Sequence, residues 1–304
     1  MRNVALVKST DRYEAVTKAL ELVRGDIHLP DKPILVKPNF VVAKKPIGEI
    51  ANSHPDAIRA TLDFLKGLGV RKFIIADGPG LGEPLAPVLD NFGYRELAKS
   101  YNIEFRDLNS DTPVAVTLLD KDMKPKTYGI AKSMVDSYRV SLSVMKTHNV
   151  VVLTLAIKNT VIGSLVGKAN KPSIHQGYRA MNISMAKIAS FIPNDLSIID
   201  GVVGMEGDGP VETGTAINSG VALASIDALA CDTIGAEIMG FDPDDVGYLW
   251  YLKQTTGFSR RQVRVLGERV AACKMKYKPH PKYLDQLNWH VSDWQDFFPK
   301  AAAA

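Results

Sequence analysis

The sequence predicts an α/β fold with a mostly parallel central sheet and helices on both faces. The first observation is that short apolar runs alternate with stretches of helical periodicity. The second is the unit over residues 34–76, where apolar runs at 34–36 and 73–76 flank a helical pattern that starts at Pro55. Such a βαβ unit indicates parallel pairing, because parallel strands need a long crossover. The third is size, since 304 residues with 46% hydrophobic content can bury a large core.

The individual elements are assigned in chain order from the same signals. Pro38 ends the second strand because proline cannot continue a central ladder. Pro55 suits the first position of a helix, which places His54 at the N-cap or beside it. Strands are expected at 4–7, 34–36, 73–76, 138–145, 196–199 and 221–224, β-like runs at 103–108 and 114–119, and helices near 11–23, 55–67, 85–89, 94–101, 151–162, 181–191, 226–239, 242–251 and 259–270.

The chain shows no internal repeat, no low-complexity tract and no linker that would divide it. We therefore expect residues 1–300 to form one α/β domain, with room for a small lobe inserted at about 103–135. Residues 301–304 are four alanines and are expected to be a tail outside the fold.

The composition excludes several classes of protein. Lys and Arg number 37 against 33 Asp and Glu, a net charge of +4, so we expect neither nucleic acid nor a membrane surface as partner. No apolar stretch reaches the roughly 20 residues of a membrane helix, and a strand-like run starts so early that no signal peptide is expected. The two isolated cysteines, Cys231 and Cys273, cannot build a disulfide framework and indicate a reduced, cytoplasmic compartment.

Polar residues gather directly after strand-like runs or in the loops beyond them. Ligands of open α/β sheets bind outside the carboxyl ends of the strands, so these residues are expected to share one crevice. Alone, each group has a simpler explanation, because a lysine after a strand is usually a solvated charge and Asp-Gly is usually a turn. Together, the groups favour a functional site. They are Lys37 with Asn39, Asp77 with Gly78, Lys146 with His148, the loop 168–175 with His175, and Asp200 with Glu206 and Asp208.

The stretch Ser197–Pro210 combines a strand with an acidic, glycine-rich loop. The strand is expected to end at Asp200, and Glu206 and Asp208 follow among four glycines. Three carboxylates suit a hard divalent cation, which prefers oxygen ligands. The alternative is a glycine-rich turn with solvated acids. The sequence thus predicts Asp200, Glu206 and Asp208 as ligands of a divalent metal ion whose identity stays open.

Several motifs of the chain resemble those of the domain-of-unknown-function family 362. They occur in order between about residues 34 and 240 and are Lys37-Pro38-Asn39, Ser53-His54-Pro55, Asp77-Gly78-Pro79, Lys146-Thr147-His148, Lys158-Asn159, His175 and Gly204-Met205-Glu206-Gly207-Asp208-Gly209-Pro210. The resemblance implies a fold and a site but no settled activity. Some members carry cysteine-rich iron–sulfur segments, and two isolated cysteines cannot ligate such a cluster, so no iron–sulfur cluster is expected here.

These expectations combine into a metal-assisted enzyme that acts on a small anionic metabolite, either a carboxylate or a phosphate. His148 or His175 would move a proton near neutral pH, with Lys146 as a third catalytic residue. The metal ion would polarise a carbonyl or phosphoryl oxygen. A non-catalytic carrier of a cofactor or metabolite and a scaffold subunit remain alternatives, and a homo-oligomer is compatible with each. Substrate binding is predicted for Lys37, Asn39, His54, Asp77, Lys158 and Asn159.

Overall fold

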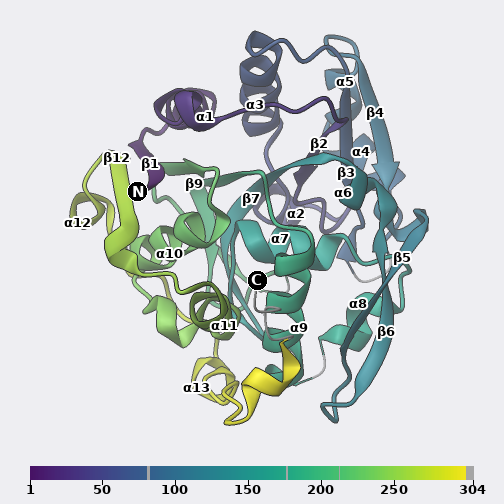
Figure 1. The fold of residues 1–304 in the computed structure, drawn as a ribbon. Coiled ribbons are helices and arrows are strands. Elements are labelled where there is room, and N and C mark those ends of the chain that lie inside the picture. Colours follow the sequence, from purple (N-terminus) through teal and green to yellow (C-terminus); the bar gives the residue numbers. More distant parts are fainter. Residues whose placement is uncertain (81–82, 176, 212, 299–304) are drawn as a thin grey trace.

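The computed structural model describes residues 1–80, 83–175, 177–211 and 213–298, and in this part of the chain a ten-stranded sheet forms the centre (Figure 1). The strand order is β12-β1-β11-β9-β7-β2-β3-β4, with β8 beside β7 and β10 beside β9. Along this order neighbours are parallel, except that β11 is antiparallel to both β1 and β9. The prediction of a mostly parallel α/β fold is confirmed. The tail expected at 301–304 lies outside the described residues.

Most strands of the sheet are short, whereas the central strands β7 and β9 have 11 residues each and are largely buried. Their bounds are β1 (Arg2–Lys8), β2 (Ile34–Pro38), β3 (Phe73–Asp77), β4 (Ile103–Asp107), β7 (Tyr138–His148), β8 (Val152–Thr154), β9 (Leu196–Glu206), β10 (Thr215–Ile217), β11 (Val221–Ser225) and β12 (Val263–Gly267). The strands β5 (Pro113–Leu119) and β6 (Pro125–Ala131) form a separate antiparallel pair within the segment 103–135.

Helices cover both faces of the sheet (Figure 1). They are α1 (Arg12–Leu22), α2 (Gly48–Ala51), α3 (Pro55–Gly67), α4 (Leu85–Asn91), α5 (Tyr94–Leu97), α6 (Lys132–Asp136), α7 (Ala156–Gly163), α8 (Asn170–Ile174), α9 (Tyr178–Phe191), α10 (Ala228–Met239), α11 (Gly247–Thr256), α12 (Val270–Cys273) and α13 (Tyr283–Gln286). One core packs α1, α3 and α4 against the sheet, and the other packs α7, α9, α10 and α11 against its opposite face.

The two cores are separated by the alternation of side chains along each strand. In β2, Ile34 and Val36 belong to the core beside α1 and α3, whereas Leu35 belongs to the core beside α7. Successive side chains of a strand point to opposite faces, so Lys37 follows Leu35 toward α7. The same rule assigns Ile198 to the α1 face and Ile199 to the α7 face. These assignments decide which polar residues can meet.

Three predicted elements differ from the structure. The strand expected at 196–199 continues to Glu206, because β11 and then β10 pair with it beyond Asp200. The helix expected over 151–162 is instead a short strand, β8, followed by α7, since 152–154 pair back onto the end of β7. The helix expected at 259–270 contains β12, which adds as an edge strand to β1. In each case tertiary pairing overrides the local pattern.

Candidate functional site

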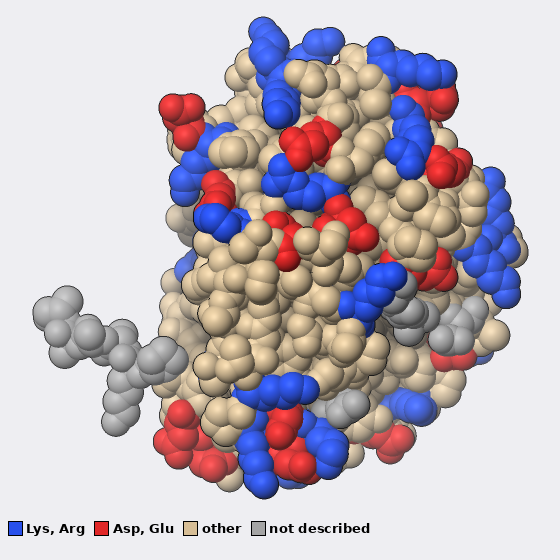
Figure 2. Space-filling model, turned by 90° about the vertical axis from the view of Figure 1, so that its right-hand side faces the viewer, with Lys and Arg blue, Asp and Glu red and all other residues tan. Residues whose placement is uncertain are grey.

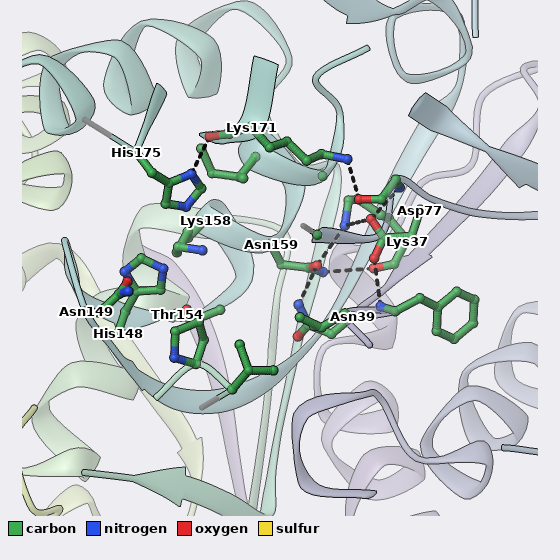
Figure 3. A pocket seen from close by; sticks show the side chains of 18 of the residues that line it. Lys37, Asn39, Asp77, His148, Asn149, Thr154, Lys158, Asn159, Lys171 and His175 are labelled. Carbon is green, nitrogen blue, oxygen red and sulfur yellow. Dashed lines mark hydrogen bonds and ion pairs between the residues drawn. The ribbon is translucent and has the colours of Figure 1, made fainter. Parts of the chain in front are cut away.

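The carboxyl ends of β2, β3 and β7 meet at a cavity of about 230 Å³ (Figure 3). The loops that leave these strands, the hairpin strand β8 and the helices α7 and α8 complete its walls. This is the position expected for a ligand site in an open parallel sheet. The polar side chains that line the cavity are Lys37, Asn39, Asp77, His148, Asn149, Thr154, Lys158, Asn159, Lys171 and His175.

One wall of the cavity is a buried ion pair. Lys37 Nζ lies 2.7 Å from Asp77 Oδ1, and the two side chains are 1% and 5% exposed. The carboxylate also accepts hydrogen bonds from the backbone N–H of Gly78 at 2.8 Å and of Phe40 at 2.7 Å. Burial lowers the pKa of Lys37, whereas the charge of Asp77 opposes that shift. The carboxylate and the amine of this pair therefore bond to each other and to other protein groups, and together they form one wall of the cavity.

Asn159 joins this pair to β7. Its Oδ1 accepts hydrogen bonds from Lys37 Nζ at 2.8 Å and from Asn39 Nδ2 at 2.9 Å. Its Nδ2 donates to the Lys37 carbonyl at 2.9 Å and to Ser141 Oγ at 3.0 Å. Asn39 Oδ1 in turn accepts from the N–H of Val144 at 2.8 Å. The predicted substrate-binding residues Asn39 and Asn159 thus line the cavity and lock α7 to two strands.

His148, the last residue of β7, has its ring fixed by the turn that follows. Its Nδ1 accepts hydrogen bonds from the N–H of Val150 at 3.0 Å and of Val151 at 3.3 Å. Nδ1 is therefore unprotonated and Nε2 carries the proton of the neutral ring. Burial, followed by the charge of Lys158, lowers the pKa of His148 well below its ordinary value. Val152, in the same hairpin, has a φ of 66°, a conformation that β-branched residues rarely adopt and that marks backbone strain at this turn.

His175 has the opposite tautomer. It follows α8, and its Nδ1 lies 2.6 Å from the carbonyl oxygen of Lys171. A carbonyl only accepts, so Nδ1 carries the proton and Nε2 keeps a lone pair. Burial lowers the pKa of His175 to about 4, so the ring is neutral at pH 7. The ring centroids of His148 and His175 are 5.6 Å apart. The cavity therefore holds a hydrogen-bond donor and a proton acceptor on neighbouring rings.

Lys158 projects from α7 beside the two histidines (Figure 3). Lys158 is 7% exposed, and no hydrogen bond joins its Nζ to another residue among those described (Figure 3). Burial, together with the charge of Lys37, lowers its pKa to about 7. The amine is therefore divided between its charged and neutral forms at neutral pH.

The position of α7 depends on a buried carboxylate from α10. Asp232 is fully buried and accepts hydrogen bonds from the first two N–H groups of the helix, those of Ala156 at 2.9 Å and Ile157 at 3.0 Å. Burial raises the pKa of Asp232 to about 7, and these hydrogen bonds oppose the shift. Asp232 therefore acts on the cavity by holding the helix that carries Lys158 and Asn159.

Lys171 also lines the cavity, although the sequence does not predict it as a site residue. Its Nζ donates to Asn109 Oδ1 at 2.7 Å and to the carbonyl of Gly78. Burial lowers the pKa of Lys171 to about 8. The segment 168–175, expected to be a loop, contains α8, which brings Lys171 and His175 to the cavity four residues apart. That spacing is the signal that could have identified Lys171.

Lys146 lies close to the cavity but does not line it. Its amine is fully buried and donates to the carbonyl of Ala51 at 2.7 Å. Burial, followed by the charge of Lys158, lowers its pKa to about 7. The sequence predicts Lys146 and His148 on one side of an extended strand, and both pair in regular register with β8, but the amine of Lys146 is held by the carbonyl of Ala51. Lys146 therefore contributes to the electrostatic potential of the site without facing the cavity.

The positive charge of the site comes from buried lysines in and behind the cavity. Three lysines line the cavity, Lys146 lies behind it, and Asp77 is the single carboxylate among the described lining residues. By contrast, Figure 2 shows Lys and Arg side chains interspersed with Asp and Glu on the outer face it displays. Buried like charges are costly without an opposite charge, so an anion in this cavity would be stabilised.

The structure does not bring the three carboxylates predicted as metal ligands together. Asp200 lies on the α1 face of β9, where Arg12 Nε is 2.6 Å from its carboxylate. Glu206 accepts a hydrogen bond from the N–H of Lys278 at 2.8 Å. Asp208 bonds to His280 at 2.8 Å and to Thr213 at 2.7 Å. Over the described ranges, no three or more His, Cys, Asp or Glu side chains are placed to hold a metal ion.

The expectation that one cavity gathers all predicted site residues is therefore partly wrong. Lys37, Asp77 and His148 share the cavity, whereas Asp200 and Glu206 lie outside it. The physical reason is the period of the strand, because Asp200 shares the face of Ile198, opposite to the side that Lys37 reaches. His54 also lies outside the cavity and caps α3, where its Nδ1 accepts from the N–H of Asp56 at 3.1 Å.

Two solved structures are similar at 12% identity: a protein from Thermotoga maritima (TM-score 0.44, 67% of this chain and 54% of that chain) and the lactate racemase apoprotein from Thermoanaerobacterium thermosaccharolyticum (TM-score 0.39, 72% and 54%). This chain thus spans about half of each, and similarities of that size carry no inference about its function.

A curated relative matches more of the sequence. The thylakoid-associated protein sll1697 of Synechocystis sp. is 26% identical over 276 residues, which cover 88% of this chain and 79% of the relative. Within the described residues, no helix has the length and hydrophobicity needed to cross a membrane. The family model named domain of unknown function (DUF362) matches residues 34–237, which include the strands and helices that build most of the cavity, and the chain therefore belongs to the DUF362 family.

Proposed function

We propose that the protein is an enzyme that binds a small carboxylate or phosphate anion in this cavity and transfers a proton on it. The observation that carries the proposal is the pair of neutral histidines with opposite tautomers beside Lys158. An acid–base reaction needs a donor and an acceptor that face the same bound molecule, and His148 Nε2 and His175 Nε2 supply them.

The anionic nature of the ligand follows from the lysines. Lys158 has a pKa of about 7 in the cavity. A bound anion would favour its charged form and restore the balance of charge around the site. Lys37 and Lys171 are held by protein acceptors and would act through their electrostatic potential. A bound anion would therefore contact the charged amine of Lys158 directly and be stabilised further by the electrostatic potential of Lys37 and Lys171.

A non-catalytic binding or carrier protein is the second candidate. The same cavity would bind an anion without turnover, and the excess of lysines favours binding in either case. The two candidates differ in one property, because only the enzyme exchanges a proton on carbon. The proposed step does not need the predicted divalent metal ion, and its predicted ligands Asp200, Glu206 and Asp208 do not line the cavity.

Deuterium exchange separates these candidates. The purified protein is incubated in deuterated buffer with a panel of small hydroxy acids, oxo acids and phosphate esters, and C–H to C–D exchange is followed by NMR. Binding of each compound is measured in parallel by calorimetry. The enzyme is supported by exchange on at least one bound compound, and binding without any exchange would favour the carrier. If no panel compound binds, the proposal of an anion site is refuted.

Two matched variants test whether His148 and His175 transfer the proton. In His148→Asn, the amide oxygen replaces the accepting Nδ1, and in His175→Asn the amide nitrogen replaces the donating Nδ1. Both keep the local hydrogen bond and remove Nε2. We expect exchange to fall by about 10²–10⁴-fold in each, the usual contribution of a general acid or base.

A further inference from the structure

We propose that Lys158 forms an imine with the carbonyl carbon of a small 2-oxo acid. This inference rests on the proposed function, because it names the substrate class of the same cavity.

Four lysines are buried at the site, and the amines of three of them donate hydrogen bonds to protein acceptors. Lys37 Nζ donates to Asp77 and Asn159, Lys171 Nζ to Gly78 and Asn109, and Lys146 Nζ to the carbonyl of Ala51. Within the described part of the chain, Lys158 Nζ has no such acceptor and faces the cavity (Figure 3). Its amine is thus the one among these four that can meet a ligand atom directly.

The environment of Lys158 favours a nucleophilic amine. An amine attacks only in its neutral form, and desolvation is a common way in which proteins activate a lysine. At a pKa of about 7 the neutral fraction at pH 7 is about half, whereas an exposed lysine with a pKa near 10.4 is neutral in roughly one molecule per 2,500. The difference is on the order of a thousandfold in reactive amine.

The surrounding groups match the two functional groups of a 2-oxo acid. His148 Nε2–H is a donor for the carboxylate. Thr154 lines the cavity at 2% exposure, and its buried Oγ1 has no hydrogen-bond partner among the described residues, so it supplies a second donor. His175 Nε2 is a proton acceptor near the amine. A cavity of about 230 Å³ is smaller than the roughly 300–1,000 Å³ of sites for drug-sized ligands, which favours a molecule of few atoms.

The reaction balances without a further reagent. The lone pair of Lys158 Nζ forms a bond to the carbonyl carbon, and the π electrons of the C=O bond move to its oxygen. His175 Nε2 takes one proton from Nζ and returns it to that oxygen, which gives a carbinolamine. The carbon–oxygen bond then breaks, the second Nζ proton leaves with the oxygen as water, and the C=N bond remains. Amine and carbonyl thus become imine and water, with no change of oxidation state.

Reductive trapping tests the proposal. The full-length protein is incubated at pH 7 with pyruvate as the probe, sodium borohydride is added, and the reduced adduct is located by peptide mass spectrometry. We expect one adduct, on Lys158, at a level at least roughly tenfold above that of any other lysine, given the difference in neutral amine. Lys146 and Lys171 are internal controls, because they are similarly buried but their amines donate to protein acceptors.

The outcomes separate this inference from the proposed function. Protein unfolded in urea serves as a control, in which adducts should be spread over many lysines. The same spread in the folded protein, or no adduct at all, would overturn the proposal that Lys158 forms an imine. If pyruvate binds in calorimetry without an adduct on Lys158, the imine is overturned and the anion site stands. The variant Lys158→Arg keeps a cation but cannot form an imine, so it should lose the adduct. Because the trapping site is mapped in the unmodified protein, the test does not depend on that variant folding.

Discussion

Replacing Asp77 by asparagine should reveal how much of the site is held by its buried ion pair. The change keeps the size of the side chain and removes the charge opposite Lys37, whose side chain is 1% exposed. Removing one partner of a buried pair typically costs about 3–5 kcal/mol, because the other charge remains without compensation. Asp77 also accepts the N–H groups of Gly78 and Phe40, and an amide cannot accept all three donors. We therefore expect a loss of at least about 3 kcal/mol in the free energy of unfolding.

The measurement is urea denaturation of the two proteins as a function of pH. Without Asp77, the folded state should lower the pKa of Lys37 further below its unfolded value of about 10.4. The unfolded chain then binds the additional proton, so the penalty is largest at low pH and shrinks as pH rises toward about 10. The double variant Asp77→Asn with Lys37→Met should cost less than the sum of the single changes. A loss under about 1 kcal/mol, or additive single effects, would refute this account.

Three further results are expected. Gly163→Ala should destabilise the protein and disturb the ion pair, because the new Cβ would lie 2.1 Å from Lys37 Cε and 2.5 Å from Asp77 Oδ1; wild-type stability in denaturation would contradict this. Asp232→Asn should flatten the pH dependence of stability between about pH 4 and 7. The raised pKa of Asp232 means that the folded state binds its proton more tightly, so stability falls as pH rises through this window by up to about 1.4 kcal/mol per unit; parallel pH profiles of variant and wild type would exclude that role. Asp208→Asn should leave the metal content of the purified protein unchanged in elemental analysis, and a loss of bound divalent metal in that variant would return the acidic loop to the site.

The elements around the cavity illustrate what local sequence predicts well. The runs at 34–36 and 73–76 and the Pro55 signal correctly predicted β2, α3 and β3. Parallel strands of one sheet present their carboxyl ends at the same edge, so Lys37, Asp77 and His148 were predicted to meet, and all three line the cavity. Motif order alone was also sufficient for the family, since the match covers 34–237.

The local sequence did not predict which strands pair with one another. An apolar run followed by polar residues marks where a local pattern changes, but whether a strand continues depends on a neighbour that supplies hydrogen bonds. β9 extends past Asp200 because β11 and β10 lie beside it, and β8 forms because it pairs back onto β7. The short helix α8 has no strong period of its own, yet it places Lys171 and His175 at the cavity.

The sequence by itself determined the fold class, the family and the edge of the sheet at which polar residues gather, because these depend on periodicity and on the order of motifs. Only the tertiary structure decided which side chains meet. A change of one residue along a strand reverses the face, so Asp200 pairs with Arg12 while Lys37 reaches Asp77. The protonation of the site was decided in the same way. The tautomers of His148 and His175 follow from backbone groups of the β7–β8 turn and of α8, and the lowered pKa of Lys158 follows from burial that only the packed chain provides.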